Sequence, residues 1–77
     1  MAESIPELKA RVSAKTEEEH GGVLPEGYRV WFRRYGTKGA GRWRVRGPYA
    51  WVEADSEEYI RREAWWLVAC DENGMGG

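Results

Sequence analysis

A chain of 77 residues holds at most one domain, and a domain of this size buries only about 60% of the surface of its unfolded chain. Its 42% hydrophobic and 32% charged residues are typical of a globular domain. The chain has no apolar stretch long enough to span a bilayer and no evident signal peptide, so we expect a cytoplasmic protein without a membrane partner.

A single cysteine and a single histidine limit the chemistry available to this chain. Cys70 alone excludes an internal disulfide, and Cys70 with His20 makes too few ligands for a zinc site. His20 lies in a stretch rich in glycine and glutamate, and nothing in the pattern holds it beside Cys70 as a catalytic base. We therefore predict a protein that is not an enzyme and uses no metal or other cofactor.

Charge is unevenly distributed along the chain, although the formal net charge is only −1. Residues 27–48 contain seven bases and no acid, for a net charge of +7. The flanking segments 1–26 and 49–77 have net charges of −3 and −5. A basic segment between two acidic ones predicts a local surface for an anionic partner.

Residues 1–26 are expected to form an N-terminal arm and linker. Ser4 is a candidate N-cap and Pro6 suits the first turn of a helix, but Leu8 and Val12 form only a thin apolar stripe. Three consecutive acids at 17–19 precede a Gly-Gly break. This pattern predicts a short or frayed helix or a disordered arm, ending in a linker.

From Tyr28 the pattern has a period of two, which predicts a three-stranded antiparallel sheet within a domain spanning residues 27–72. Strands are expected at 28–35, 42–46 and 49–54, joined by a glycine-rich loop and a Gly47-Pro48 reversal. A two-residue turn at Gly47-Pro48 would put proline at the second central position, which is unusual unless its peptide bond is cis. A turn longer than two residues is therefore the alternative to a two-residue turn.

A single strand register brings the apolar residues together on one face of the predicted sheet and the arginines together on the other. It sets Arg33 opposite Arg44, Phe32 opposite Val45 and Arg42 opposite Glu53, and because a slip of one residue inverts a strand, the agreement favours the sheet. Two arginines side by side destabilise a sheet unless an anion or a stacked aromatic relieves the repulsion. The register therefore favours a binding role for the arginine face.

A C-terminal helix is predicted from Asp55, the expected N-cap, to Cys70 or Asp71. Its apolar stripe is expected to include Trp66, with Trp65 at the edge of the core. A rival interpretation makes residues 65–70 a fourth strand. Residues 73–77 are expected to be a disordered tail. The fold class predicted is α+β, with the sheet packed on this one helix.

The face of the sheet away from the helix is the candidate binding site, with Lys38 in the adjoining loop. Guanidinium groups bind phosphates, and aromatic rings stack on unpaired bases, so nucleic acid is the favoured partner. The alternative is a regulator or inhibitor of the phage or mobile-element kind that binds an acidic protein. A third interpretation is an ordinary surface whose arginines pack on aromatic rings or pair with the acidic flanks. The candidate residues are Arg29, Trp31, Arg33, Tyr35, Lys38, Arg42, Arg44, Arg46, Tyr49 and Trp51.

A family resemblance rests on three segments: Tyr28-Arg29-Val30, Gly41-Arg42-Trp43-Arg44-Val45-Arg46 and Asp55-Ser56-Glu57-Glu58. Three strands followed by a helix, over residues 27–70, resemble the plant AP2-type DNA-binding domain and the arm-binding N-terminal domain of phage integrases. Those families lay the sheet in the major groove of DNA, with the helix behind it, so the resemblance favours DNA over RNA as the partner. The resemblance implies that the DNA contacts are Arg29, Trp31, Arg33, Arg42, Arg44 and Arg46.

Overall fold

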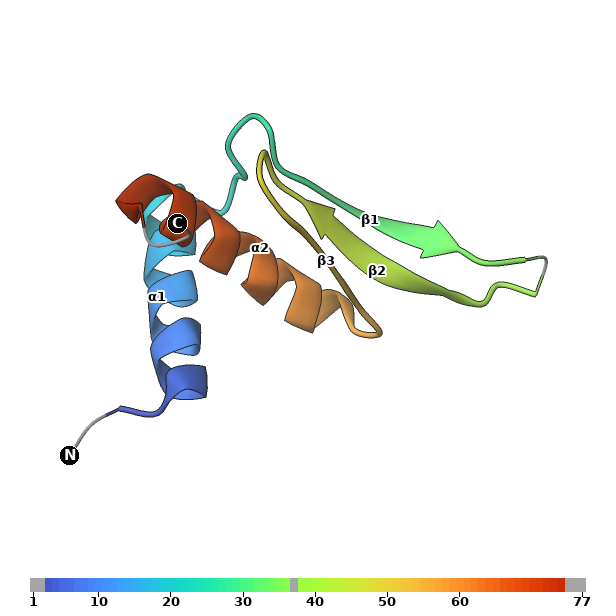
Figure 1. Cartoon of the computed structure of the whole chain (residues 1–77), viewed down its shortest axis with the longest axis horizontal. Helices are drawn as coiled ribbons and strands as arrows, with labels where there is room; N and C mark the ends of the chain where they lie inside the picture. The colour runs from blue at the N-terminus through green and yellow to red at the C-terminus, as the bar shows by residue number, and fades with distance from the viewer. Residues whose placement is uncertain (1–2, 37, 75–77) are drawn as a thin grey trace.

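Two helices and three strands follow one another along the chain in the computed structural model, which describes residues 3–36 and 38–74 (Figure 1). They are α1 (Ile5–Glu19), β1 (Arg29–Arg34), β2 (Gly41–Arg46), β3 (Trp51–Ala54) and α2 (Glu57–Asn73). The strands form one antiparallel sheet in the order β1-β2-β3, and α2 packs on it. This arrangement confirms the predicted α+β class.

The layers are the sheet, α2 and α1, in that order. Within the described residues, α1 contacts α2 and no strand, while the β1–β2 hairpin extends beyond the first turn of α2 (Figure 1). Neither helix has both the length and the apolar character needed to cross a membrane, as far as the described residues go.

The main core lies between α2 and one face of the sheet. Val45 on the central strand and Ile60 on α2 are fully buried, and Ala54 and Ala64 allow the two layers to approach closely. Burying a side chain such as that of Val45 or Ile60 contributes about 1.5–3 kcal/mol. Partly buried residues surround this cluster: Leu24, Val30, Trp43, Val52 and Leu67.

The strand register differs from the predicted one by two residues in both hairpins. Arg33 pairs with Arg42 rather than Arg44, and Arg44 pairs with Glu53. Each side chain stays on its predicted face, because a shift of two residues preserves the alternation. In the second hairpin, Gly47 N–H donates to the Ala50 carbonyl at 2.8 Å.

The turn residues explain this shift. Closure between Gly47 and Ala50 puts Pro48 at the first central position of the turn, where the fixed φ of proline fits. In the first hairpin, β2 begins one residue early, at Gly41. A Cβ at Gly41 would lie 2.2 Å from the Arg33 carbonyl oxygen and 2.8 Å from the Phe32 ring, so only glycine fits there.

Helix α2 begins one residue later than its predicted cap implies. Ser56, not Asp55, is the N-cap, and its hydroxyl accepts from the Tyr59 N–H at 3.3 Å. Residues 65–70 are helical, which excludes the fourth strand. Asn73 belongs to α2 and Gly74 caps it at φ 68°, so these two residues of the predicted tail are ordered by the helix, whereas residues 75–77 lie outside the described part.

The N-terminal arm, for which a short helix or disorder was expected, forms the fifteen-residue helix α1, capped by Ser4 as predicted. Its contact face is largely polar and small: Ser13 and Thr16 are buried against α2. Trp65 was expected at the edge of the core but is buried, because α1 covers that side of α2. Trp66 is only half-buried.

Polar contacts tie α1 to α2 at both ends. Lys9 Nζ lies 2.6 Å from Glu63 Oε1. The His20 ring packs against Trp65 at 5.6 Å between ring centres, and its Nε2 lies 3.0 Å from Glu72 Oε1. The spacing of apolar residues along a helix does not predict contacts between residues this far apart in the chain. These contacts explain why the N-terminal arm is an ordered helix.

The Ser13 hydroxyl is buried without a hydrogen-bond partner among the described residues. Because an unsatisfied buried hydroxyl destabilises the folded state and alanine favours a helix, Ser13→Ala should raise the free energy of unfolding by about 1 kcal/mol. The same substitution at the α2 cap, Ser56→Ala, should lower it by about 1 kcal/mol. Urea denaturation measures both, and two losses of equal size would contradict the first expectation.

Candidate functional site

Nine of the predicted site residues and their neighbours occupy a grid on the face of the sheet opposite α2. The first row crosses the strands as Arg29, Arg46 and Trp51, and the second as Trp31, Arg44 and Glu53. A third row pairs Arg33 with Arg42, and Asp55 just beyond β3 binds Arg42. The structure therefore brings the predicted arginines and tryptophans together, with two carboxylates beside them. We call this surface the grid face.

Aromatic rings pack against the guanidinium groups of the grid face. The Arg44 guanidinium lies 4.4 Å from the centre of the Trp51 ring and 5.9 Å from that of Trp31. Arg29 lies 4.9 Å from the centre of Trp31, and Arg33 lies 5.4 Å from that of Tyr35. Such contacts are worth about 0.5–1 kcal/mol at exposed sites, so they hold the side chains in place more than they stabilise the fold.

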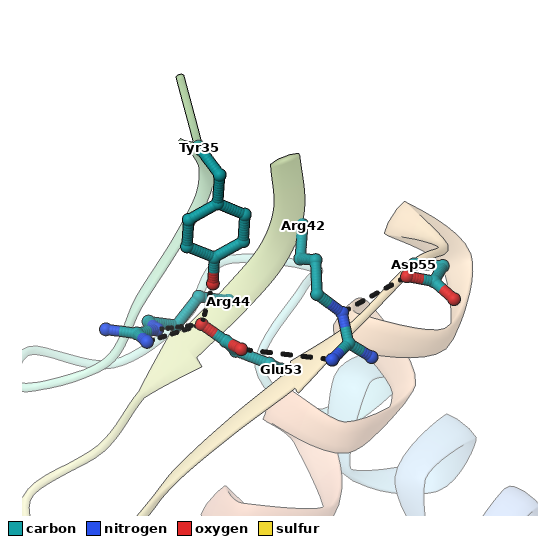
Figure 2. Close-up of polar contacts among 5 residues, drawn as sticks. All are labelled: Tyr35, Arg42, Arg44, Glu53 and Asp55. Carbon is teal, nitrogen blue, oxygen red and sulfur yellow. Dashed lines mark hydrogen bonds and ion pairs between the residues drawn. The ribbon is translucent and has the colours of Figure 1, made fainter. Parts of the chain in front are cut away.

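Glu53 is the centre of a polar network on the grid face (Figure 2). Its carboxylate accepts from the Tyr35 hydroxyl at 2.5 Å and from Arg44, whose Nε lies 3.0 Å away. Arg42 lies between Glu53, at 4.0 Å, and Asp55, at 3.1 Å (Figure 2). Two of the five arginines on the grid face are therefore paired with acids of the protein itself.

The network shifts the ionisation of its members. Hydrogen bonds from Tyr35 and Arg44 lower the pKa of Glu53 below its ordinary value. The hydrogen bond to Glu53 raises the pKa of Tyr35, so the phenol stays protonated and continues to donate. The network is therefore complete at neutral pH.

Three arginines of the grid face remain without an acid partner. Arg29, Arg33 and Arg46 are exposed, and none of them makes an ion pair with a described residue. Arg29 lies directly opposite Arg46. Like charges in this position destabilise a sheet, and the only described contact that offsets this repulsion is the packing of Arg29 on the Trp31 ring. The pair of Arg29 and Arg46 thus brings together two positive charges that no described acid neutralises.

The remaining predicted residues lie at the margins of the grid face. Lys38 is exposed in the β1–β2 loop, beyond the ends of the strands. Tyr49 is 86% exposed in the β2–β3 turn, next to the first row. Asp55 is the site residue that the sequence did not reveal, since Asp before a helix most often caps it, whereas the alternation along β3 already placed Glu53 on this face.

Other reactive groups lie away from the grid face. Cys70 is buried on α2, and its burial raises the pKa of the thiol. Across residues 3–36 and 38–74, no three His, Cys, Asp or Glu side chains gather in a group able to hold a metal ion.

No protein-family model, characterised protein or solved structure matches this chain. The resemblance to the AP2-type and integrase arm-binding domains therefore stays a prediction that rests on the order of the elements and the placement of the arginines.

The lowered pKa of Glu53 makes the stability of the protein depend on pH. A carboxylate whose pKa is depressed by folding stabilises the folded state above its unfolded pKa, about 4.3, and this contribution disappears as pH falls through the folded pKa. Glu53→Gln should therefore flatten the loss of unfolding free energy on acidification below about pH 4.5. Urea denaturation across this range measures it.

Tyr35→Phe provides a graded comparison, because it removes the hydrogen bond that lowers the Glu53 pKa most and leaves Arg44 in place. Its stability profile should fall between those of the parent protein and Glu53→Gln. A Glu53→Gln profile with the same acid dependence as the parent would show that the network does not hold the carboxylate ionised.

Proposed function

We propose that the protein is a small, non-enzymatic nucleic-acid-binding protein and that the grid face is its binding surface. The observation that carries this proposal is the pair of Arg29 and Arg46, opposed on neighbouring strands without an acid partner in the described chain. A guanidinium group donates to phosphate oxygens in a planar, bidentate geometry, and a phosphate between the two arginines would remove their repulsion.

The aromatic residues around these arginines support nucleic acid over a simple anion. Trp51 is 59% exposed beside Arg46, and Trp31 lies beneath Arg29. Rings in this position can pack on sugars or bases while the arginines hold the phosphates. DNA is favoured over RNA because the fold resemblance is to DNA-binding families. The acids at Glu53 and Asp55 confine the anion to the first row and to β1.

Affinity for nucleic acid should fall with salt, because bound arginines displace counterions from the phosphates. Three contacts, from Arg29, Arg33 and Arg46, predict a slope of about −2 to −3 in a plot of log affinity against log salt. Fluorescence anisotropy of a labelled oligonucleotide measures the slope. Arg29→Glu should weaken binding at low salt at least tenfold and make the slope shallower by about one contact.

Arg34→Glu is the matched control for this experiment. Arg34 is exposed on the same strand, lies on the opposite face and changes the net charge by the same amount. It should leave affinity within about twofold of the parent protein. Equal losses in the two variants would overturn the grid face as the site. No binding to any oligonucleotide at low salt would overturn the nucleic-acid proposal and favour the acidic-protein alternative.

A further inference from the structure

The grid face has a basic side and an acidic side. The arginines without acid partners lie on β1 and at the end of β2, whereas Glu53 and Asp55 lie on and just after β3. A phosphate chain along β1 therefore meets arginines without acid partners, whereas a phosphate chain along the β3 side meets carboxylates that already pair with Arg42 and Arg44.

This asymmetry distinguishes a duplex from a single strand. Three strands about 4.8 Å apart make a face roughly 10 Å across, similar to the width of about 12 Å of the major groove of B-DNA. A sheet lying in that groove has a phosphate chain along each edge, so one chain would run beside Glu53 and Asp55. A single strand needs only one basic track, and Arg33, Arg29 and Arg46 provide it.

The aromatic residues also favour unpaired bases. Trp31, Arg44, Arg46 and Trp51 line an open cleft of about 320 Å³. Arg44 packs against the rings of both tryptophans, and its ion pair with Glu53 fixes it there. Trp51 is one of the residues that line this cleft, and the residue as a whole is 59% exposed. Bases in a duplex stack on one another, whereas an unpaired base can place its flat face on an exposed indole.

We infer that the grid face binds single-stranded nucleic acid, with phosphates on Arg29 and Arg46 and an unpaired base stacked on Trp51. This inference rests on the proposed function and names its substrate class. Arg44 is a positioning residue in this site, since Glu53 neutralises its charge and the two indoles hold it between them.

The test compares a mixed-sequence single-stranded DNA, an RNA of the same sequence and the annealed DNA duplex by anisotropy at low salt. The single strands should bind at least tenfold more tightly than the duplex. Trp51→Ala should weaken single-strand binding roughly 5- to 150-fold, the range that one stacked base accounts for, and should change duplex binding little. Trp51→Phe keeps a ring and should recover most of the affinity.

Tyr59→Ala is the control for loss of an exposed aromatic side chain, because Tyr59 is 51% exposed on α2, away from the grid face. It should bind like the parent protein. Circular dichroism confirms that each variant is folded before binding is measured.

Each result has a distinct meaning. Duplex binding as tight as single-strand binding would overturn this inference and leave the proposed function intact. Single-strand binding that Trp51→Ala leaves unchanged would also overturn it, because the phosphate contacts would then suffice. Absence of binding to all three oligonucleotides would overturn the proposed function itself. Tighter binding to the single-stranded DNA or RNA than to the duplex, lost in Trp51→Ala and regained in Trp51→Phe, would support the inference that the grid face binds single strands.

Discussion

The packing of α2 on the sheet is the interaction on which the rest of the structure depends. Val45 and Ile60 are removed from water between the two layers, and alanines at 54 and 64 let the layers meet. Since side chains alternate along a strand, burying Val45 obliges Arg44 and Arg46 to face the other way. A small apolar core thereby determines which face of the sheet carries the guanidinium groups.

The acids of this chain divide the basic surface. Glu53 belongs to the same sheet as the arginines and binds Arg44 and Arg42, whereas the acidic residues of α1 contribute nothing to the grid face because α1 packs on α2 alone. Ion pairs within the protein thus neutralise arginines on the β3 side of the grid face. On the other side, Arg29 lies opposite Arg46, and no described acid pairs with either arginine. The number of arginines on the grid face therefore overstates its positive charge, because Arg42 and Arg44 pair with acids of the protein.

Helix α1 shows how tertiary contacts can order a segment with weak sequence signals. Its apolar stripe is thin, and Ile5 is 75% exposed. It is held by Trp65, by the Lys9–Glu63 pair and by the His20 contacts, all of which join residues far apart in the chain. Trp65 and small residues of α1 such as Ser13 line a pocket between the two helices. Polar and aromatic contacts between distant residues, rather than a hydrophobic periodicity, join the two helices.

The sequence by itself determined the elements that local patterns encode. Period-two alternation assigned the arginines and tryptophans of the grid face to one side of the sheet, and Ser4 marked the start of α1, because these features depend on neighbours in the chain. Only the tertiary structure decided the register, the partner of Asp55 and the burial of Trp65. A shift of two residues keeps each side chain on its face, so the alternation of residue types cannot distinguish the two registers. The turn that closes around Pro48 selects one of them. Likewise, the pairing of charges depends on distances between strands, and the positions of residues in the sequence do not determine these distances.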